Sequence, residues 1–246
     1  MLIIAGCIVF GLSLLAHLPA RLVFPENSGA FQFIGISGSV WQGEIKQVLF
    51  SGKVLPIRNL NWSVNPAALI TGTLKADFYE QLTPVNHGTV GLNLLSRQVD
   101  LYALHWQFPT NSLDAWIPLS GVKTRGNFVL DLETLKLPAN NVYPSQLEGR
   151  LDWQNAELEI DSAYWLIGSP VMQFSAEGDV IEGLVTNSQP MLPGESSFQC
   201  TIKSCQVELS LQPTPDAPQS VLDGLSLLGL QQTGDKFSGN ITFPLE

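Results

Sequence analysis

Gly35-Ile-Ser-Gly-Ser-Val-Trp-Gln-Gly-Glu44 is the stretch around which this chain is organised, and Leu60-Asn-Trp-Ser-Val-Asn-Pro-Ala-Ala-Leu-Ile-Thr-Gly-Thr-Leu74 repeats its plan. Each stretch places a tryptophan ahead of a glycine-punctuated turn, and alternating apolar residues follow it. Neither stretch contains the mix of carboxylate, imidazole, hydroxyl and thiol groups that catalysis normally requires. Both therefore predict a β scaffold rather than an active site.

Alternation of apolar and polar residues continues beyond these stretches. Leu74, Ala76 and Phe78 alternate with Lys75 and Asp77, which is typical of a sheet with one buried and one wetter face. Similar segments are found at 90–94, 99–108, 128–132, 146–153, 157–160, 172–177, 196–202, 206–212 and 238–245. The 21 glycines and 16 prolines are scattered between short segments. This pattern predicts a mainly β fold, with a twisted or curled, mostly antiparallel sheet.

Short helices are expected at residues 65–70, 110–117 and 219–228. In the first, Asn65 is suited to the N-cap and Pro66 to the first helical position. Leu60-x-Trp62 and Leu104-x-Trp106 each precede a short helix, a glycine and a further strand. This order indicates either a weak duplication within residues 35–160 or independent use of the same strand pattern.

Residues 2–18 form an apolar run without charge, and Pro19 and Arg21 close it. A helix of about 17 apolar residues is at the short end of what spans a bilayer. A cleaved signal peptide is the alternative, but proline stands beside the candidate cleavage site between Ala16 and Ala20. A lipobox at Cys7 is disfavoured because the apolar run continues past it. The expected organisation is a transmembrane anchor at 1–20, a juxtamembrane segment at 21–34 and a β domain at 35–246.

The two late cysteines are spaced for a hairpin. If residues 201–204 form its loop, Cys200 faces Cys205 and Phe198 faces Val207, so a cross-strand disulfide fits. Such a bond and the anchor together favour an oxidising compartment outside the cytoplasm. Two buried free thiols in a cytosolic protein are the alternative.

Composition and motifs exclude several functions. The formal net charge is −10, and clustered lysine and arginine are absent, which argues against a nucleic-acid partner. His17, His87 and His105 are too scattered for a zinc site, and no cofactor motif occurs. Carboxylates alternate at Asp131/Glu133 and at Glu157/Glu159/Asp161. A solvated strand face explains them better than paired-carboxylate catalysis does, so we expect no enzyme activity, cofactor or metal.

The combined motifs carry a family resemblance. The apolar run, Leu18-Pro-Ala-Arg-Leu-Val-Phe24, Gly35-x-x-Gly-x-Val-Trp-x-Gly43, Leu60-x-Trp-x-Val-x-Pro-x-x-Leu-x-x-Gly72 and the pair Cys200 and Cys205 together resemble the type II secretion system protein N family. The marker positions, expected to serve as scaffold, are Gly38, Val40, Trp41, Gly43, Leu60, Trp62, Pro66, Leu69 and Gly72.

The resemblance implies an accessory, non-enzymatic protein of the bacterial inner membrane, with one membrane pass and a periplasmic β domain. Its partners would be other inner-membrane and periplasmic components of the secretion machine that exports folded proteins across the outer membrane. A more distant similarity to AsmA-like proteins, whose curled sheets form apolar grooves, implies an alternative function in binding or shuttling phospholipid. Two-residue periodicity alone leaves open whether the apolar face closes as a core or remains an open groove.

Overall fold

The structure is a computed structural model that describes residues 17–22, 27–28, 31–113, 123–139, 143–160, 163–188, 192–215, 217–227 and 229–244. The chain divides into two compact units, Met1–Arg97 and Gln98–Glu246, here called unit 1 and unit 2. Residues 1–16, which hold most of the expected anchor, lie outside the described residues. Within the described residues, no helix has the length and apolar character needed to cross a membrane.

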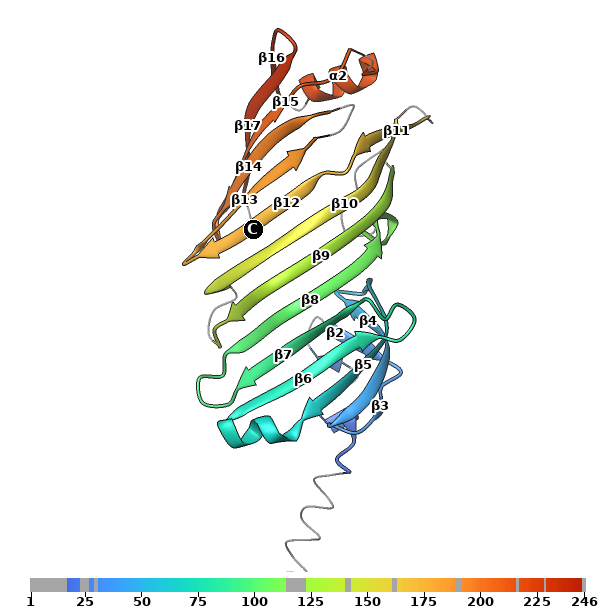
Figure 1. Cartoon of the computed structure of the whole chain (residues 1–246), viewed down its shortest axis with the longest axis vertical. Coiled ribbons are helices and arrows are strands. Elements are labelled where there is room, and N and C mark those ends of the chain that lie inside the picture. The colour runs from blue at the N-terminus through green and yellow to red at the C-terminus, as the bar shows by residue number, and fades with distance from the viewer. Residues whose placement is uncertain are drawn as a thin grey trace, which may run out of the picture. The chain divides into compact units, whose positions relative to one another are not determined.

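Unit 1 is an antiparallel sheet with two short 3-10 helices (Figure 1). β4 lies next to β2, β3 and β5, and the order then continues through β6 to β7, while β1 pairs with β2. Residues 21–34, expected to link the anchor to the β domain, therefore contribute strands. The elements are η1 Ala20–Leu22, β1 Asn27–Ser28, β2 Phe31–Ile34, β3 Ser37–Gly38, β4 Gln42–Phe50, β5 Lys53–Asn65, η2 Pro66–Thr71, β6 Thr73–Glu80 and β7 His87–Asn93.

The core of unit 1 is built from the opening motif and its echo. Trp62 and Val64 on β5 are buried together with Ile45 and Val48 on β4, and Trp41 packs against this cluster. The apolar residues of β6 that alternate in the sequence also pack there, as predicted. Ala20, at the start of the described chain, is buried in the same cluster with 1% of its surface exposed. Ala20 is thus held in the core of unit 1.

Unit 2 is also an antiparallel sheet (Figure 1). Neighbouring strands pair in chain order from β8 to β10 and from β12 to β15, while β11 folds back on β10 and β17 pairs with β15 and β16. The elements are β8 Val99–Pro109, η3 Thr110–Leu113, β9 Lys123–Leu137, β10 Gln146–Ile160, β11 Ala163–Gly168, β12 Val171–Glu177, β13 Val180–Asn187, β14 Gly194–Cys200, β15 Ser204–Leu211, α2 Gln219–Leu227, β16 Gln231–Thr233 and β17 Lys236–Pro244.

β10 is one long strand where the sequence predicts two. The register against β9 shifts between Gln154 and Glu157, and Asn155 has a positive φ of 51°. Across from this bulge, Gly126 has a φ of 113°, and a Cβ atom there would lie 2.5 Å from the Gln154 carbonyl oxygen. A bulge inserts an unpaired residue and so interrupts the alternation that marks a strand in the sequence. The predicted break at residues 154–156 is therefore wrong, and its cause is this bulge.

The helices agree with the predictions in position. α2 places Leu222 and Leu225 against Phe237 of β17, in a small apolar cluster that covers one part of unit 2. η2 is a 3-10 helix capped by Asn65, whose side chain accepts from Ala67 N, and closed by Gly72 in the left-handed conformation. For the helix predicted at residues 110–117, η3 ends at Leu113, and residues 114–117 lie outside the described residues. The mainly β, antiparallel fold with few short helices is confirmed.

Candidate functional site

The opening motif joins the start of the chain to β5. Val40 N donates to the Leu18 carbonyl oxygen at 2.8 Å, and the indole nitrogen of Trp62 donates to the Val40 carbonyl oxygen at 3.1 Å. Trp41 extends the contact, because its carbonyl oxygen accepts from Val64 N at 2.7 Å. This arrangement satisfies polar groups beside an apolar core and offers no reactive side chain.

Glycines at the marker positions allow this close packing. Gly38 and Gly43 pair across β3 and β4, and Gly38 has a φ of 91°, which disfavours residues with a Cβ atom. Gly43 also faces Trp62, whose ring occupies the space that a side chain would need. Leu60, two residues before Trp62 on β5, pairs with Ile45. Gly38, Gly43 and Leu60 thus lie at cross-strand contacts of unit 1.

Pro66, Leu69 and Gly72 form a separate group around η2. Pro66 opens the helix, and Gly72 N donates back to the Leu69 carbonyl oxygen at 3.0 Å. Leu69 is 37% exposed, so this marker residue does not belong to the core.

The predicted disulfide between Cys200 and Cys205 is present. The hairpin register is the one that the spacing predicts, because Cys200 pairs with Cys205 and Phe198 with Val207. Tyr143 adds a contact from outside the hairpin, since its hydroxyl donates to the Cys200 carbonyl oxygen at 2.8 Å. The disulfide therefore stabilises the β14–β15 hairpin.

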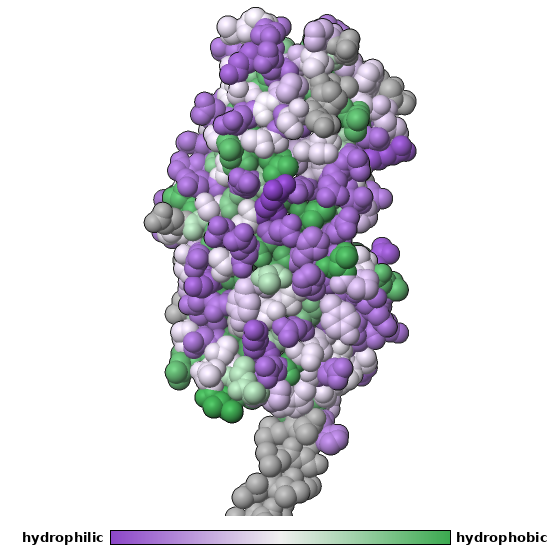
Figure 2. Space-filling model, in the orientation of Figure 1, coloured by the Kyte–Doolittle hydropathy of each residue, from purple (hydrophilic) through white to green (hydrophobic). Residues whose placement is uncertain are grey.

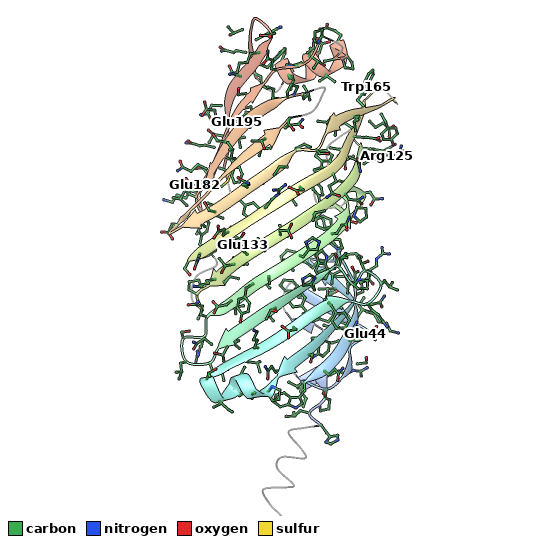
Figure 3. All side chains as sticks on the ribbon, in the orientation of Figure 1. Glu44, Arg125, Glu133, Trp165, Glu182 and Glu195 are labelled. Atoms are coloured by element: carbon green, nitrogen blue, oxygen red, sulfur yellow. A yellow bond between two sulfur atoms is a disulfide. The ribbon has the colours of Figure 1, made fainter. Side chains whose placement is uncertain are left out.

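Polar side chains line up across several strands of unit 2, and Figure 3 labels two of them, Glu133 on β9 and Glu182 on β13. Antiparallel register aligns Glu148, Ser175, Glu182, Gln199 and Gln206 into one row across β10, β12, β13, β14 and β15. A second row, one step along the strands, contains Asp131, Arg150, Gln173, Leu184, Ser197, Glu208 and Asn240. Residues two apart on a strand point to the same face, so both rows share one face of the sheet. We call them the polar rows.

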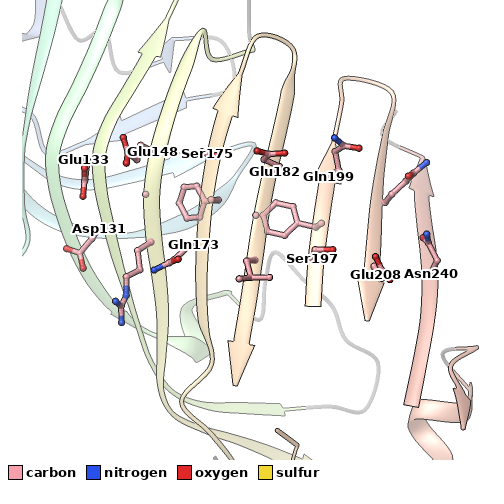
Figure 4. Close-up of a pocket in the computed structure, with 17 residues that line it drawn as sticks. Asp131, Glu133, Glu148, Gln173, Ser175, Glu182, Ser197, Gln199, Glu208 and Asn240 are labelled. Carbon is pink, nitrogen blue, oxygen red and sulfur yellow. The ribbon is translucent and has the colours of Figure 1, made fainter. Parts of the chain in front are cut away.

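The polar rows line an open hollow of about 940 Å³ (Figure 4). Glu133 on β9 adds a further carboxylate. Arg150 is the basic residue of the lining, and its Nε donates to Asp152 at 2.6 Å, which raises the pKa of the guanidinium. Figure 2 shows a mostly hydrophilic surface over the strands of unit 2, with apolar residues scattered among them. The hollow is thus lined mainly by polar groups, with more acidic than basic residues, and suits a polar or basic partner.

The alternate positions of the same strands are apolar or glycine. Leu132, Gly149, Phe174, Gly183 and Phe198 are consecutive cross-strand partners, and Val207 and Ile241 continue the row. A Cβ atom at Gly149 would lie 2.8 Å from the Phe174 ring, and one at Gly183 would lie 2.4 Å from the Phe198 ring. Each ring therefore covers a glycine on the neighbouring strand, and these two glycines and two phenylalanines also belong to the lining of the hollow. We call this set the apolar row.

A second charged group lies where β9, β10 and β11 meet. The Arg125 guanidinium lies 3.4 Å from the centroid of the Tyr164 ring, a cation–π contact. The Tyr164 hydroxyl donates to Glu159, which also pairs with Lys123 at 3.4 Å. The hydrogen bond from Tyr164 lowers the pKa of the Glu159 carboxyl, and the same bond raises the pKa of the Tyr164 hydroxyl. Every member of this group is engaged with another, as in a structural surface network.

The candidate chemical residues do not gather into a site. His105 bonds to Asp131 at 2.5 Å, whereas His87 contacts the Val85 carbonyl oxygen at 2.7 Å in the other unit. Asp131 and Glu133 both line the hollow, while Glu159 belongs to the Tyr164 group, and Asp161 lies outside the described residues. Among the described residues, no histidine, cysteine and carboxylate cluster of metal-binding size is found.

The polar rows are the surface that sequence reasoning missed. Their signal is the polar half of each alternation, such as Gln173 and Ser175 within 172–177. The alternation predicts that these two share a face, but only strand register shows which residues of other strands stand beside them.

Comparison with known proteins gives a consistent result. The family described as type II secretion system (T2SS), protein N, matches residues 30–239. The chain is similar to the type II secretion system protein N of Vibrio cholerae serotype O1 (strain ATCC 39315 / El Tor Inaba N16961). The two are 27% identical over 230 residues, which cover 88% of this chain and 86% of the relative. No solved structure matches.

Proposed function

Because the chain belongs to the type II secretion system protein N family, we propose that it is an accessory, non-enzymatic component of that machinery that works through protein contacts. Residues 2–18 hold it in the inner membrane with a single pass, and both β units lie in the periplasm. The apolar length of this run and the Cys200–Cys205 disulfide support this placement.

The observation that carries the proposed protein contact is the wet, acidic hollow of unit 2. Its lining includes Glu133, Glu148, Glu182 and Glu208 beside a single arginine, Arg150. Phe174, Leu184 and Phe198 also line the hollow, but charged and polar residues outnumber them. An acyl chain would therefore gain less free energy there than in a wholly apolar groove, because stabilisation by burial depends on apolar area. A protein segment with basic or amide side chains exchanges its contacts with water for charge-assisted hydrogen bonds there. The hollow thus favours a polar macromolecular partner.

Site-specific photo-crosslinking in intact cells tests this assignment. A photoreactive residue at Gln199 or Gln206, both in the polar rows, should capture a defined component of the secretion machine. The charge reversals Glu182→Lys and Glu208→Lys should reduce both the adduct and export of secreted proteins. Glu195→Lys is the matched control, because Glu195 is an exposed residue of β14 outside the lining. Unchanged export and adducts in the reversed variants would contradict the proposal.

A second candidate function, binding of phospholipid, is favoured by the apolar row. Phe174, Phe198 and Val207 are half-buried, so part of their surface remains open to solvent. Native mass spectrometry of the detergent-purified chain separates the two functions. Retained phospholipid that is lost in Phe174→Ser and Phe198→Ser would support lipid carriage, whereas lipid-free protein that still crosslinks through the hollow would support the protein-contact function.

A further inference from the structure

The most exposed large apolar side chains of unit 1 are gathered mainly at one end of its sheet. Leu95 is 90% exposed, Ile70 is 89% exposed and Leu22 is 68% exposed. Leu82, at 73%, lies instead in the turn that joins β6 to β7. Exposure of such side chains to water is unfavourable, so a set of them on one end indicates a contact.

Ordered turns hold Ile70 and Leu95 near each other. Ile70 lies in η2, which precedes β6, and Leu95 follows β7, the neighbour of β6. Leu94 N donates to the Gly72 carbonyl oxygen at 2.9 Å, which ties the two turns together. The Asn93 side chain accepts from Leu95 N and Ser96 N, each at 3.0 Å. The exposed side chains of Ile70 and Leu95 therefore project from turns whose backbone is held by hydrogen bonds.

The same end receives the chain from the N-terminal apolar run. Pro19 forms a β-bridge with Ser39, and Val40 N bonds to the Leu18 carbonyl oxygen. Val64, two residues before η2, bonds in turn to Trp41. Leu18, where the apolar run ends, is thus linked through short backbone contacts to η2.

Charge at this end is opposite to the charge of the whole chain. Arg21, Lys75 and Arg97 lie close along the sequence to Leu22, Ile70 and Leu95, respectively. No aspartate or glutamate occurs in residues 17–22, 62–76 or 91–97, although the whole chain has 22 acidic and 12 basic residues. Lysine and arginine near a membrane are attracted to anionic headgroups, while the apolar side chains enter the boundary with the acyl chains.

We propose that this end of unit 1, formed by Leu22, Ile70 and Leu95 with Arg21, Lys75 and Arg97, lies on the surface of a bilayer that contains anionic phospholipid. It is a second membrane contact beside the apolar run of residues 2–18, and it holds the sheet of unit 1 close to the membrane. This inference rests on the membrane attachment proposed above.

Fluorescence of the full chain in nanodiscs tests the contact. A Cys7→Ser background carries Ile70→Cys or Leu95→Cys, labelled with the environment-sensitive dye NBD. Leu82→Cys is the matched control, because β6 spans eight residues, roughly 25 Å, between η2 and that turn. In discs of phosphatidylethanolamine and phosphatidylglycerol, the NBD emission of labels at positions 70 and 95 should shift to shorter wavelength. Doxyl-labelled lipid should quench this emission. Discs of phosphatidylcholine alone, or high salt, should weaken both effects, and the label at position 82 should show neither.

If the labels at positions 70 and 95 emit at the same wavelength as the water-exposed label at position 82, the inference is overturned while the membrane attachment stays intact. A blue shift without quenching by lipid would also overturn it, because a protein surface would then cover this end. A chain that fails to enter the disc fraction would refute the attachment and, with it, this second contact. Quenching at positions 70 and 95, without quenching at position 82, would establish the second membrane contact.

Discussion

Gly43 on β4 and Trp62 on β5 are cross-strand partners, and the indole ring covers the glycine so closely that a Cβ atom there would lie 2.3 Å from Cζ2 of Trp62. The indole nitrogen of the same ring donates to the Val40 carbonyl oxygen, so Trp62 contacts both Val40 and Gly43 of the opening motif. Val40 N also donates to the Leu18 carbonyl oxygen, so the packing of Gly43 and Trp62 affects how Leu18 is held against the opening motif.

The variant Gly43→Ala should be less stable than the wild type by about 1–3 kcal/mol, because an added methyl group forces the ring to move. Thermal unfolding of the detergent-solubilised chain measures this change. The same substitution in a Trp62→Ala background should cost less, since the ring is gone. If Gly43→Ala is equally destabilising in both backgrounds, the added methyl group clashes with the Ser37 carbonyl oxygen, which lies 2.4 Å from the same Cβ position, and not with the Trp62 ring.

Trp62→Ala should destabilise the chain by about 3–5 kcal/mol, as expected for the loss of a large buried aromatic side chain. The ring is only 6% exposed. Leu82→Ala is the control, because Leu82 is 73% exposed and should change the melting temperature little. Equal melting temperatures for Trp62→Ala and the wild type would show that Trp62 is not a core residue.

Reduction of the disulfide, or the double variant Cys200→Ser and Cys205→Ser, should lower the free energy of unfolding by about 2 kcal/mol, because the closed loop is short. Denaturation with and without a reducing agent measures this difference. Cys7→Ser should respond to the reducing agent as the wild type does. A reduced chain as stable as the oxidised one would contradict a stabilising role for the bond.

Tyr164→Phe should raise the pKa of the Glu159 carboxyl toward its ordinary value, because the hydroxyl that lowers this pKa is removed. Since the pKa of Glu159 is lower in the folded chain, its stabilising contribution is present above the unfolded pKa and is lost as the pH falls through the folded pKa. The variant should lose this contribution across that acidic range. An NMR titration of the Glu159 carboxyl carbon measures the shift, and Tyr79→Phe should leave it unchanged.

The sequence by itself determined the fold class, the family and the pairing of Cys200 with Cys205. Each depends on local information: alternation along a strand, motif spacing, or a hairpin loop short enough to fix its own register. The cap of η2 follows equally from Asn65, Pro66 and Gly72. The strands that the sequence did not predict include β2, β11, β13 and β16. In β13, Gly183 and apolar residues on both faces obscure the alternation.

The tertiary structure alone decided which residues of different strands stand side by side. Glu148 and Glu182 belong to one wet surface only because β12 lies between their strands in a particular register. Ile70 and Leu95 lie at the same end of unit 1 only because β6 pairs with β7 and Leu94 bonds to Gly72. Strand pairing sums many weak interactions over distant parts of the chain, and no single stretch of sequence contains that information.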